Sequence, residues 1–303
     1  MHFNFLKTQN KKVYPLISIF LFSLILFATG RLGNIGFSPR TLQEKIEKFL
    51  PLESKATFRL DKIVPAVVRI DCYFGEELGG GSGASAYWDL DLGQHWIITN
   101  AHVVKKADGS LADECWVYFP SEDGSFFKSV YKAGEIYTYD GLEEIEIKGV
   151  RVGGFQGWSE GGVDLALLKI TEPGEDNSGN KYPFPTDFPD IFSVAAKTCR
   201  NDRVTELGEK LYILGYPVIG GENLTVTEGI VSGFEGPLNE WVKISAKTEY
   251  GNSGGIAVLE NDGCLLGMPT FVSTGQLESL AGVLTYNFIF DFIDGYSERT
   301  KQD

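Results

Sequence analysis

Positive charge is scarce in this chain, and repetitive sequence is absent from it. Its 303 residues include 27 Lys and Arg against 41 Asp and Glu, which gives a formal net charge of -14 at pH 7. No basic patch is visible, so nucleic acid is not expected as a main partner. There are no internal repeats and no low-complexity tracts, and few segments show a helical period.

Cysteine is also rare, with four residues in the whole chain. None has the spacing of a metal site, so no metal is expected. An even count in an exported chain permits two disulfides, although sequence alone cannot give their pairing. Pairing Cys72 with Cys115 and Cys199 with Cys264 would keep each bridge within one half of the chain. Buried free thiols are the alternative.

The residues that are abundant favour sheet. The chain is 43% hydrophobic and holds 36 glycines, together with many Val, Ile, Phe and Tyr. This length and apolar content suffice for one or two compact domains with buried cores.

The amino-terminal segment has the pattern of an export signal. Lys7, Lys11 and Lys12 precede an apolar run from Tyr14 to Gly30. We expect residues 1–30 to be either a signal peptide cleaved after Gly30 or, uncleaved, a hydrophobic helix that anchors the chain in a membrane once. The lysines lie on the starting side, so the rest should face away from the cytoplasm, in the cell envelope or secreted. The sequence of residues 31–60 predicts a juxtamembrane helical arm.

From residue 61 onward, short apolar runs are separated by Gly, Asp and Asn. Two sets of six strand-like runs predict an all-β fold of two six-stranded antiparallel β-barrels, at 61–170 and 206–303, joined by a Pro- and Asp-rich linker at 171–205. The course of 121–144 stays open, and 288–300 predicts a closing helix. The twelve runs are 63–75, 79–90, 95–104, 114–120, 145–154, 163–170, 210–217, 224–234, 241–247, 254–260, 264–273 and 281–289.

The stretch "GNSGG", residues 251–255, raises the question of a nucleophilic serine. It fits the nucleophile elbow of an α/β-hydrolase, the nucleophile loop of a chymotrypsin-like protease, or an ordinary glycine-rich turn. A serine nucleophile needs a histidine base. The chain has only His2, His95 and His102, all upstream of Ser253. In α/β-hydrolases the histidine follows the serine, so the elbow is excluded.

The order His, Asp, Ser remains available. His102 lies in "IITNAHVV", where an apolar strand ends in a polar turn, and Asp164 lies in "GGVDLALLKI", at the start of another apolar strand. Taken singly, each could be structural, but their joint occurrence with Ser253 favours a catalytic triad. His95 has no matching context and is interpreted as a strand-edge residue.

Together, "TNAHVV", "DLALLKI" and "GNSGG" resemble the protease domain of the HtrA (DegP-like) branch of trypsin-like serine peptidases, over roughly residues 62 to 290. The resemblance implies a chymotrypsin-like fold and a serine endopeptidase that needs no metal or organic cofactor. It implies Ser253 as nucleophile, His102 as base and then acid, and Asp164 as the group that orients His102. The N–H groups of Gly251 and Ser253 would form the oxyanion hole.

The sequence departs from the family pattern in several respects. Ile256 stands where the family usually has proline, and about fifty residues after Ser253 leave no room for a PDZ domain. A homo-oligomer such as the trimer common in the family therefore stays open. Lys247 and Thr248 stand near the floor of the expected substrate pocket and would favour an acidic or polar residue, unless Lys247 points to solvent.

Two function classes follow from these patterns. The first is an active endopeptidase with protein or peptide substrates. The second is a protease-like domain that binds or senses with little turnover.

Overall fold

The computed structural model describes most of the chain from residue 59 onward. The described residues are 59–88, 94–139, 145–147, 150–152, 163–175, 178–183, 188–195, 197–199, 205–221, 223–236, 238–274, 279–291 and 293. All of them belong to one compact unit, Ala56–Asp303. The predicted hydrophobic leader, and the predicted arm as far as residue 58, lie outside the described residues. Within the residues described, no helix has the length and apolar character needed to cross a bilayer.

The first barrel has six antiparallel strands in the order β3-β2-β1-β4-β5-β8, and pairing of β3 with β8 closes it. In β4 alternate residues are buried, which is the pattern of a strand with one face against a core. The strands are β1 (Val67–Phe74), β2 (Glu77–Trp88), β3 (Gln94–Thr99), β4 (Glu114–Pro120), β5 (Phe127–Thr138) and β8 (Ala166–Glu175).

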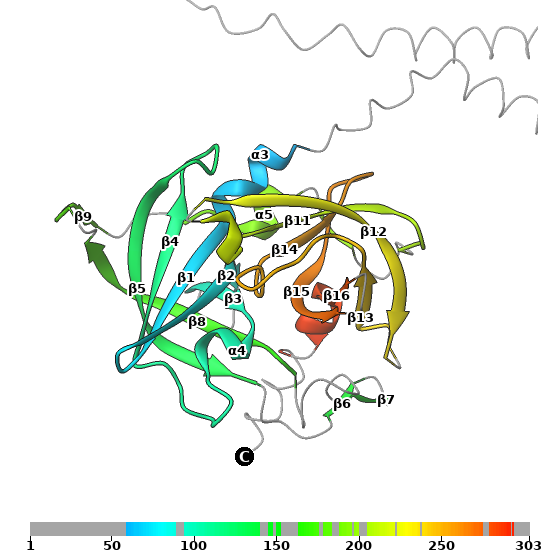
Figure 1. Ribbon diagram of the computed structural model, residues 1–303, viewed down its shortest axis with the longest axis horizontal. Coiled ribbons are helices and arrows are strands. Elements are labelled where there is room, and N and C mark those ends of the chain that lie inside the picture. Colours follow the sequence, from blue (N-terminus) through cyan, green and yellow to red (C-terminus); the bar gives the residue numbers. More distant parts are fainter. Residues whose placement is uncertain are drawn as a thin grey trace, which may run out of the picture. The chain divides into compact units, whose positions relative to one another are not determined.

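The second barrel also has six antiparallel strands, in the order β15-β14-β11-β12-β13-β16, and pairing of β15 with β16 closes it. The predicted pair of six-stranded barrels is thereby confirmed (Figure 1). The strands are β11 (Lys210–Gly215), β12 (Thr225–Glu235), β13 (Trp241–Ile244), β14 (Ile256–Leu259), β15 (Cys264–Thr274) and β16 (Ser279–Thr285).

Short elements complete the described chain. Residues 286–291 are helical, within and just before the predicted closing segment. The others are α3 (Leu60–Ile63), η1 (Val64–Ala66), α4 (Ala101–Val104), β6 (Ile145–Ile147), β7 (Val150–Val152), β9 (Lys181–Tyr182), α5 (Ile191–Val194), β10 (Lys197–Thr198) and η2 (Val218–Gly220).

Two parts of the predicted strand pattern differ from the structure. The run at 145–154 was expected as a barrel strand, but among the described residues β6 and β7 form a separate two-stranded sheet. The sixth strand of the first barrel is instead β5, from the stretch 121–144 left open by the sequence. In addition, β8 continues to Glu175, and β9, α5 and β10 also fall within the predicted linker at 171–205.

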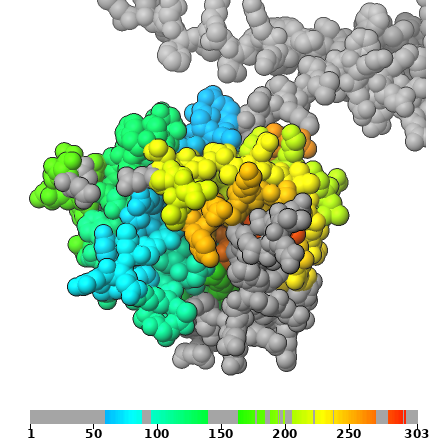
Figure 2. Space-filling view, viewed as in Figure 1, coloured from blue at the N-terminus to red at the C-terminus, as the bar shows by residue number. Residues whose placement is uncertain are grey.

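The two barrels pack against each other through an apolar seam, and Figure 2 shows them in contact, the first in blue to green and the second in yellow to red. One buried cluster combines residues of both, among them Ala84 and Ile98 of the first barrel and Leu214 and Ile256 of the second. Each barrel also has its own core. Burying this surface at the seam favours docking of the barrels by the hydrophobic effect.

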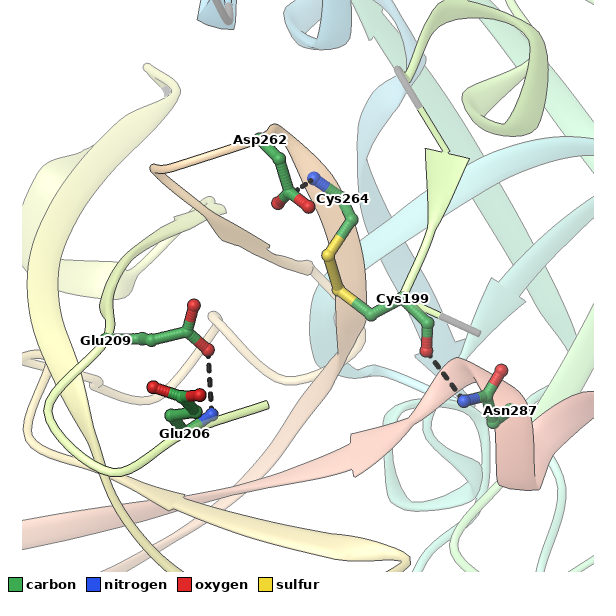
Figure 3. The surroundings of a disulfide bond; sticks show 6 residues. All are labelled: Cys199, Glu206, Glu209, Asp262, Cys264 and Asn287. Carbon is green, nitrogen blue, oxygen red and sulfur yellow. Dashed lines mark hydrogen bonds between the residues drawn. A yellow bond between two sulfur atoms is a disulfide. The ribbon is translucent and has the colours of Figure 1, made fainter. Parts of the chain in front are cut away.

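Each barrel carries one disulfide, and both follow the pairing considered for the sequence. Cys72 and Cys115 lie directly opposite each other on β1 and β4. Cys199 follows β10 and joins Cys264 at the start of β15 (Figure 3). There Asn287 Nδ2 donates to the carbonyl of Cys199 at 2.6 Å, which ties the bridge to the closing helical segment. All four cysteines are paired, so the free-thiol alternative is wrong.

Candidate active site

His102 lies in the short helix α4, directly after strand β3. Asn100, in extended conformation, stands at the N-cap position between the strand and a single helical turn, and its side chain makes no capping hydrogen bond. Val103 and Val104 are buried in the first-barrel core, whereas the His102 side chain is 47% exposed. Burial of the two valines therefore fixes the turn against the core of the first barrel and leaves the imidazole exposed at the barrel edge.

Asp164 stands beside His102 because β3 pairs antiparallel with β8. Thr99 is opposite Ala166, which places the residues just after β3 next to those just before β8. Asp164 Oδ2 lies 2.6 Å from His102 Nδ1, and Oδ1 accepts the His102 backbone N–H at 3.0 Å. An ionised carboxylate can only accept, so Nδ1 carries the proton and Nε2 is left as the basic nitrogen.

The environment of His102 acts on its pKa in two directions. Burial against the barrel edge lowers the pKa, while the hydrogen bond and the negative charge of Asp164 raise it. The net result is a pKa above the ordinary value of 6.5. Asp164 therefore stabilises the protonated ring, which is the state that a general base reaches after taking a proton.

Ser253 lies in the loop between β13 and β14, and the glycines around it allow the loop its shape. Gly251 has φ 98°, a conformation that other residues rarely adopt. A Cβ at Gly251 would also lie 2.3 Å from the carbonyl oxygen of Tyr216. The Ser253 hydroxyl is half-buried and reaches the carbonyl of Thr270 at 3.4 Å.

Gly81 lies between the segment that carries Ser253 and the helix that carries His102. A Cβ at Gly81 would meet the Val103 side chain at 2.8 Å and the Ser253 carbonyl at 2.9 Å. No hydrogen bond joins the Ser253 hydroxyl to the His102 ring within the described part of the chain. Such bonds are often long before substrate is bound and tighten in the complex.

A buried amide connects the segments across the seam. Asn100 Nδ2 donates to the carbonyl of Asp164 at 2.9 Å and to the hydroxyl of Thr270 at 3.1 Å. Thr270 is in turn the residue whose carbonyl the Ser253 hydroxyl reaches. Asp164, in the first barrel, and Ser253, in the second, thus share a hydrogen-bonded network.

The backbone near Ser253 presents two N–H groups that could stabilise an oxyanion. The carbonyl of Tyr250 accepts from Val218 N at 2.8 Å, and the carbonyl of Asn252 accepts from Gly255 N at 3.0 Å. In a trans peptide the N–H points away from its C=O, so these bonds direct the N–H groups of Gly251 and Ser253 to the opposite side. Neither N–H has an acceptor among the residues that the structure describes.

Comparison with known families assigns most of the chain to one family. The family of the trypsin-like peptidase domain matches residues 81–268, which include all three triad candidates. The chain belongs to the trypsin-like peptidase domain family. The prediction of a trypsin-like peptidase made from the sequence is thereby confirmed. No significant match was found among curated proteins.

Solved structures share the trypsin-like fold. The crystal structure of the serine endoprotease from Yersinia pestis matches with a TM-score of 0.50 and 22% sequence identity, over 78% of this chain. The match covers 64% of that structure's chain, so this chain corresponds to only part of it. At this identity the likeness concerns the fold, and it agrees with the two-barrel architecture described above.

Other residues singled out in the sequence lie differently in this trypsin-like domain. Lys247 is exposed and its carbonyl accepts from the Thr227 hydroxyl, whereas Thr248 is buried. The exposed Lys247 favours the alternative in which this side chain points to solvent. His95 lies on β3 with its ring against Phe188 and is not part of the triad arrangement.

Three uncharged residues that connect the barrels have no role predicted from the sequence. These are Ser82 in "GGGSG", Asn100 in "TNAHVV" and Thr270 on β15, all buried. Asn100 stands in a motif quoted from the sequence, and Ser82 and Thr270 stand in predicted strands, but hydroxyl and amide groups carry no charge pattern that indicates a partner. Only the three-dimensional contacts identify what they bind.

Proposed function

We propose that this protein is a serine endopeptidase that hydrolyses peptide bonds in protein substrates through His102, Asp164 and Ser253. The observation that carries the proposal is the double contact of Asp164 with the ring and backbone of His102, at the same seam as Ser253. The two N–H groups directed away from the Tyr250 and Asn252 carbonyls add the second requirement of acyl transfer.

The proposed reaction begins with attack of the Ser253 hydroxyl oxygen on the peptide carbonyl carbon. His102 Nε2 takes the hydroxyl proton as the new C–O bond forms, and Asp164 stabilises the resulting imidazolium. The negative charge on the former carbonyl oxygen is stabilised by the N–H groups of Gly251 and Ser253. Collapse breaks the C–N bond, and the departing amine receives the proton from His102.

An acyl-enzyme on Ser253 remains after this step. A water molecule attacks the ester, with His102 again accepting a proton, and the acid product leaves as Ser253 regains its hydrogen. Every proton transfer uses Nε2, the nitrogen that the Asp164 contact leaves free. No step of this scheme uses a metal ion or an organic cofactor.

Labelling with a fluorophosphonate probe tests the proposal, because the probe reacts with an activated serine. The wild-type protein should be labelled and should cleave a fluorogenic protein substrate, and Ser253→Ala should lose both activities. Absence of Ser253-dependent labelling in a folded protein would refute the proposed chemistry.

One observation favours the second function class, a protease-like binding or sensing domain. The hydrogen bond of the Ser253 hydroxyl goes to the carbonyl of Thr270 rather than to the His102 ring. In that case Ser253→Ala would leave peptide binding unchanged while no turnover is seen in the wild type. The labelling experiment therefore separates the two classes.

We further propose that the domain acts outside the cytoplasm. Two disulfides within one domain are typical of oxidising compartments, which supports export by the segment at residues 1–30. The segment would be a cleaved signal peptide or a single membrane anchor. Cell fractionation together with mass determination of the mature amino terminus distinguishes these, and recovery of reduced, uncleaved protein in the cytosol would contradict both.

A further inference from the structure

Ser82 is the residue in which the contacts of the barrel seam converge. It lies on β2 in the first barrel and is fully buried. Its hydroxyl donates to the carbonyl of Gly251 at 2.6 Å and accepts from Tyr216 N at 2.8 Å. Its own backbone N–H donates to the carbonyl of Ser253 at 2.8 Å. All three partners belong to the second barrel.

The backbone around Ser82 is shaped to allow this approach. A Cβ at Gly215 would lie 2.9 Å from Ser82 Oγ, and a Cβ at Gly81 would lie 2.9 Å from the Ser253 carbonyl. Both distances are shorter than ordinary contacts, so side chains at these positions would push the two barrels apart. The carbonyl of Ser82 is also held, since it accepts from the Thr99 hydroxyl at 2.7 Å.

The two carbonyls that Ser82 binds belong to the two residues proposed to stabilise the oxyanion. Gly251 and Ser253 each offer an N–H to substrate, and Ser82 binds the C=O of each. The N–H groups are directed by other bonds, from Val218 and Gly255. Ser82 supplies the remaining constraint, because it fixes the opposite end of each residue relative to the first barrel, where His102 lies.

We propose that Ser82 is a positioning residue that holds the oxyanion-binding loop in register with the His102–Asp164 pair. The inference rests on the proposed function and deepens it, since it names a residue on which transition-state stabilisation depends. Ser82 is fully buried, so its side chain is not open to a substrate. Its loss should therefore lower kcat and leave KM nearly unchanged, because only the transition state makes the oxyanion contacts.

The test compares Ser82→Ala with Ser85→Ala. Ser85 is a matched control because it lies on the same strand and is equally buried, yet its hydroxyl has no hydrogen-bond partner among the described residues. We expect Ser82→Ala to reduce kcat by about 10- to 100-fold, the range that a small misplacement of catalytic groups can cost. Ser85→Ala should change kcat by less than about twofold.

Further readouts separate positioning from general destabilisation. The acid limb of the pH profile should not move in Ser82→Ala, because the contact between His102 and Asp164 is within the first barrel. Amide hydrogen exchange in residues 249–255 should become faster in Ser82→Ala and not in Ser85→Ala. If Ser82→Ala folds poorly, Gly215→Ala perturbs the Ser82 hydroxyl from the opposite barrel, together with Asn252 Oδ1 at 2.7 Å, and should also lower kcat.

The outcomes also distinguish this inference from the proposed function. If the wild type shows no Ser253-dependent labelling, the proposed function fails, and the exchange rates alone still decide whether Ser82 holds the loop. A Ser82→Ala protein with wild-type kcat and unchanged exchange in residues 249–255 would overturn the inference. So would equal effects of the Ser82 and Ser85 substitutions.

Discussion

Replacing Asp164 by asparagine perturbs the proposed triad at the contact on which its assignment depends. In the structure, Asp164 Oδ1 accepts the His102 backbone N–H at 3.0 Å. The single side-chain oxygen of asparagine can still accept this N–H, so the position of α4 should be kept. The amide nitrogen would then face Nδ1, where Asp164 Oδ2 now lies at 2.6 Å. An amide N–H can only donate, so it would require Nδ1 to be the unprotonated nitrogen.

The proton of the ring would then reside on Nε2, and His102 could no longer act as the base for Ser253. For a Ser-His-Asp triad this change of tautomer lowers kcat by roughly 10⁴-fold. At 1.36 kcal/mol for each factor of ten, that corresponds to about 5 kcal/mol of transition-state stabilisation. KM should change little, because Asp164 is proposed to act through His102 and not on substrate.

The assay is the rate of fluorophosphonate labelling together with kcat and KM on a peptide substrate. Asp113→Asn is the control, since Asp113 also accepts a backbone N–H, from Gly75 at 2.6 Å, but at the turn between β1 and β2. It should retain wild-type rates. A loss smaller than tenfold in a folded Asp164→Asn protein would refute the assigned role of Asp164.

Three further outcomes are expected. The value of kcat/KM should fall as the pH drops, with a midpoint above pH 6.5, because His102 must be neutral to act as a base and its pKa is raised. A midpoint below pH 6.5 would contradict this expectation. Gly251→Ala should lower kcat by roughly 100-fold or more, since φ 98° and the nearby Tyr216 carbonyl force the oxyanion peptide to move; unchanged turnover would exclude Gly251 from the hole. Replacing Cys199 and Cys264 by serine removes a cross-link over a sequence separation of 65 and should lower the free energy of unfolding by about 4 kcal/mol. Denaturant titration measures this change, and an unchanged midpoint would show that the bridge does not stabilise the domain.

The barrel architecture could be predicted because most strands have a simple pattern of apolar runs bounded by turn residues. Strand β5 lacks that pattern. Its exposed and half-buried positions include Lys128, Lys132 and Glu135, and pairing with β8 shifts register near Ala133. The run at 145–154 has a clean apolar alternation, and nevertheless β6 and β7 within it form a separate two-stranded sheet. Local periodicity shows that a segment can be a strand but does not identify its partner.

The residues of the candidate site could likewise be proposed from the sequence only where residue type limits the choices. Three histidines and one "GNSGG" stretch left few combinations. Chain order excluded the α/β-hydrolase elbow, and the strand contexts of His102 and Asp164 pointed to these two residues. The residues that hold these groups together were not identified. Asn100 and Thr270 are common polar residues, and their partners, far away in the sequence, are specified by how two barrels dock.

The division of the site between barrels explains why seam contacts matter for chemistry. His102 and Asp164 both belong to the first barrel, so their contact can form before the barrels dock. Ser253 and the two N–H groups proposed to bind the oxyanion belong to the second barrel, so they lie beside the proposed base, His102, only when the seam is closed. Because Ser82 binds the carbonyls of Gly251 and Ser253 across that seam, docking of the barrels and alignment of the oxyanion hole become one event. A perturbation of the seam should therefore impair transition-state stabilisation while leaving the pKa of His102 as it is.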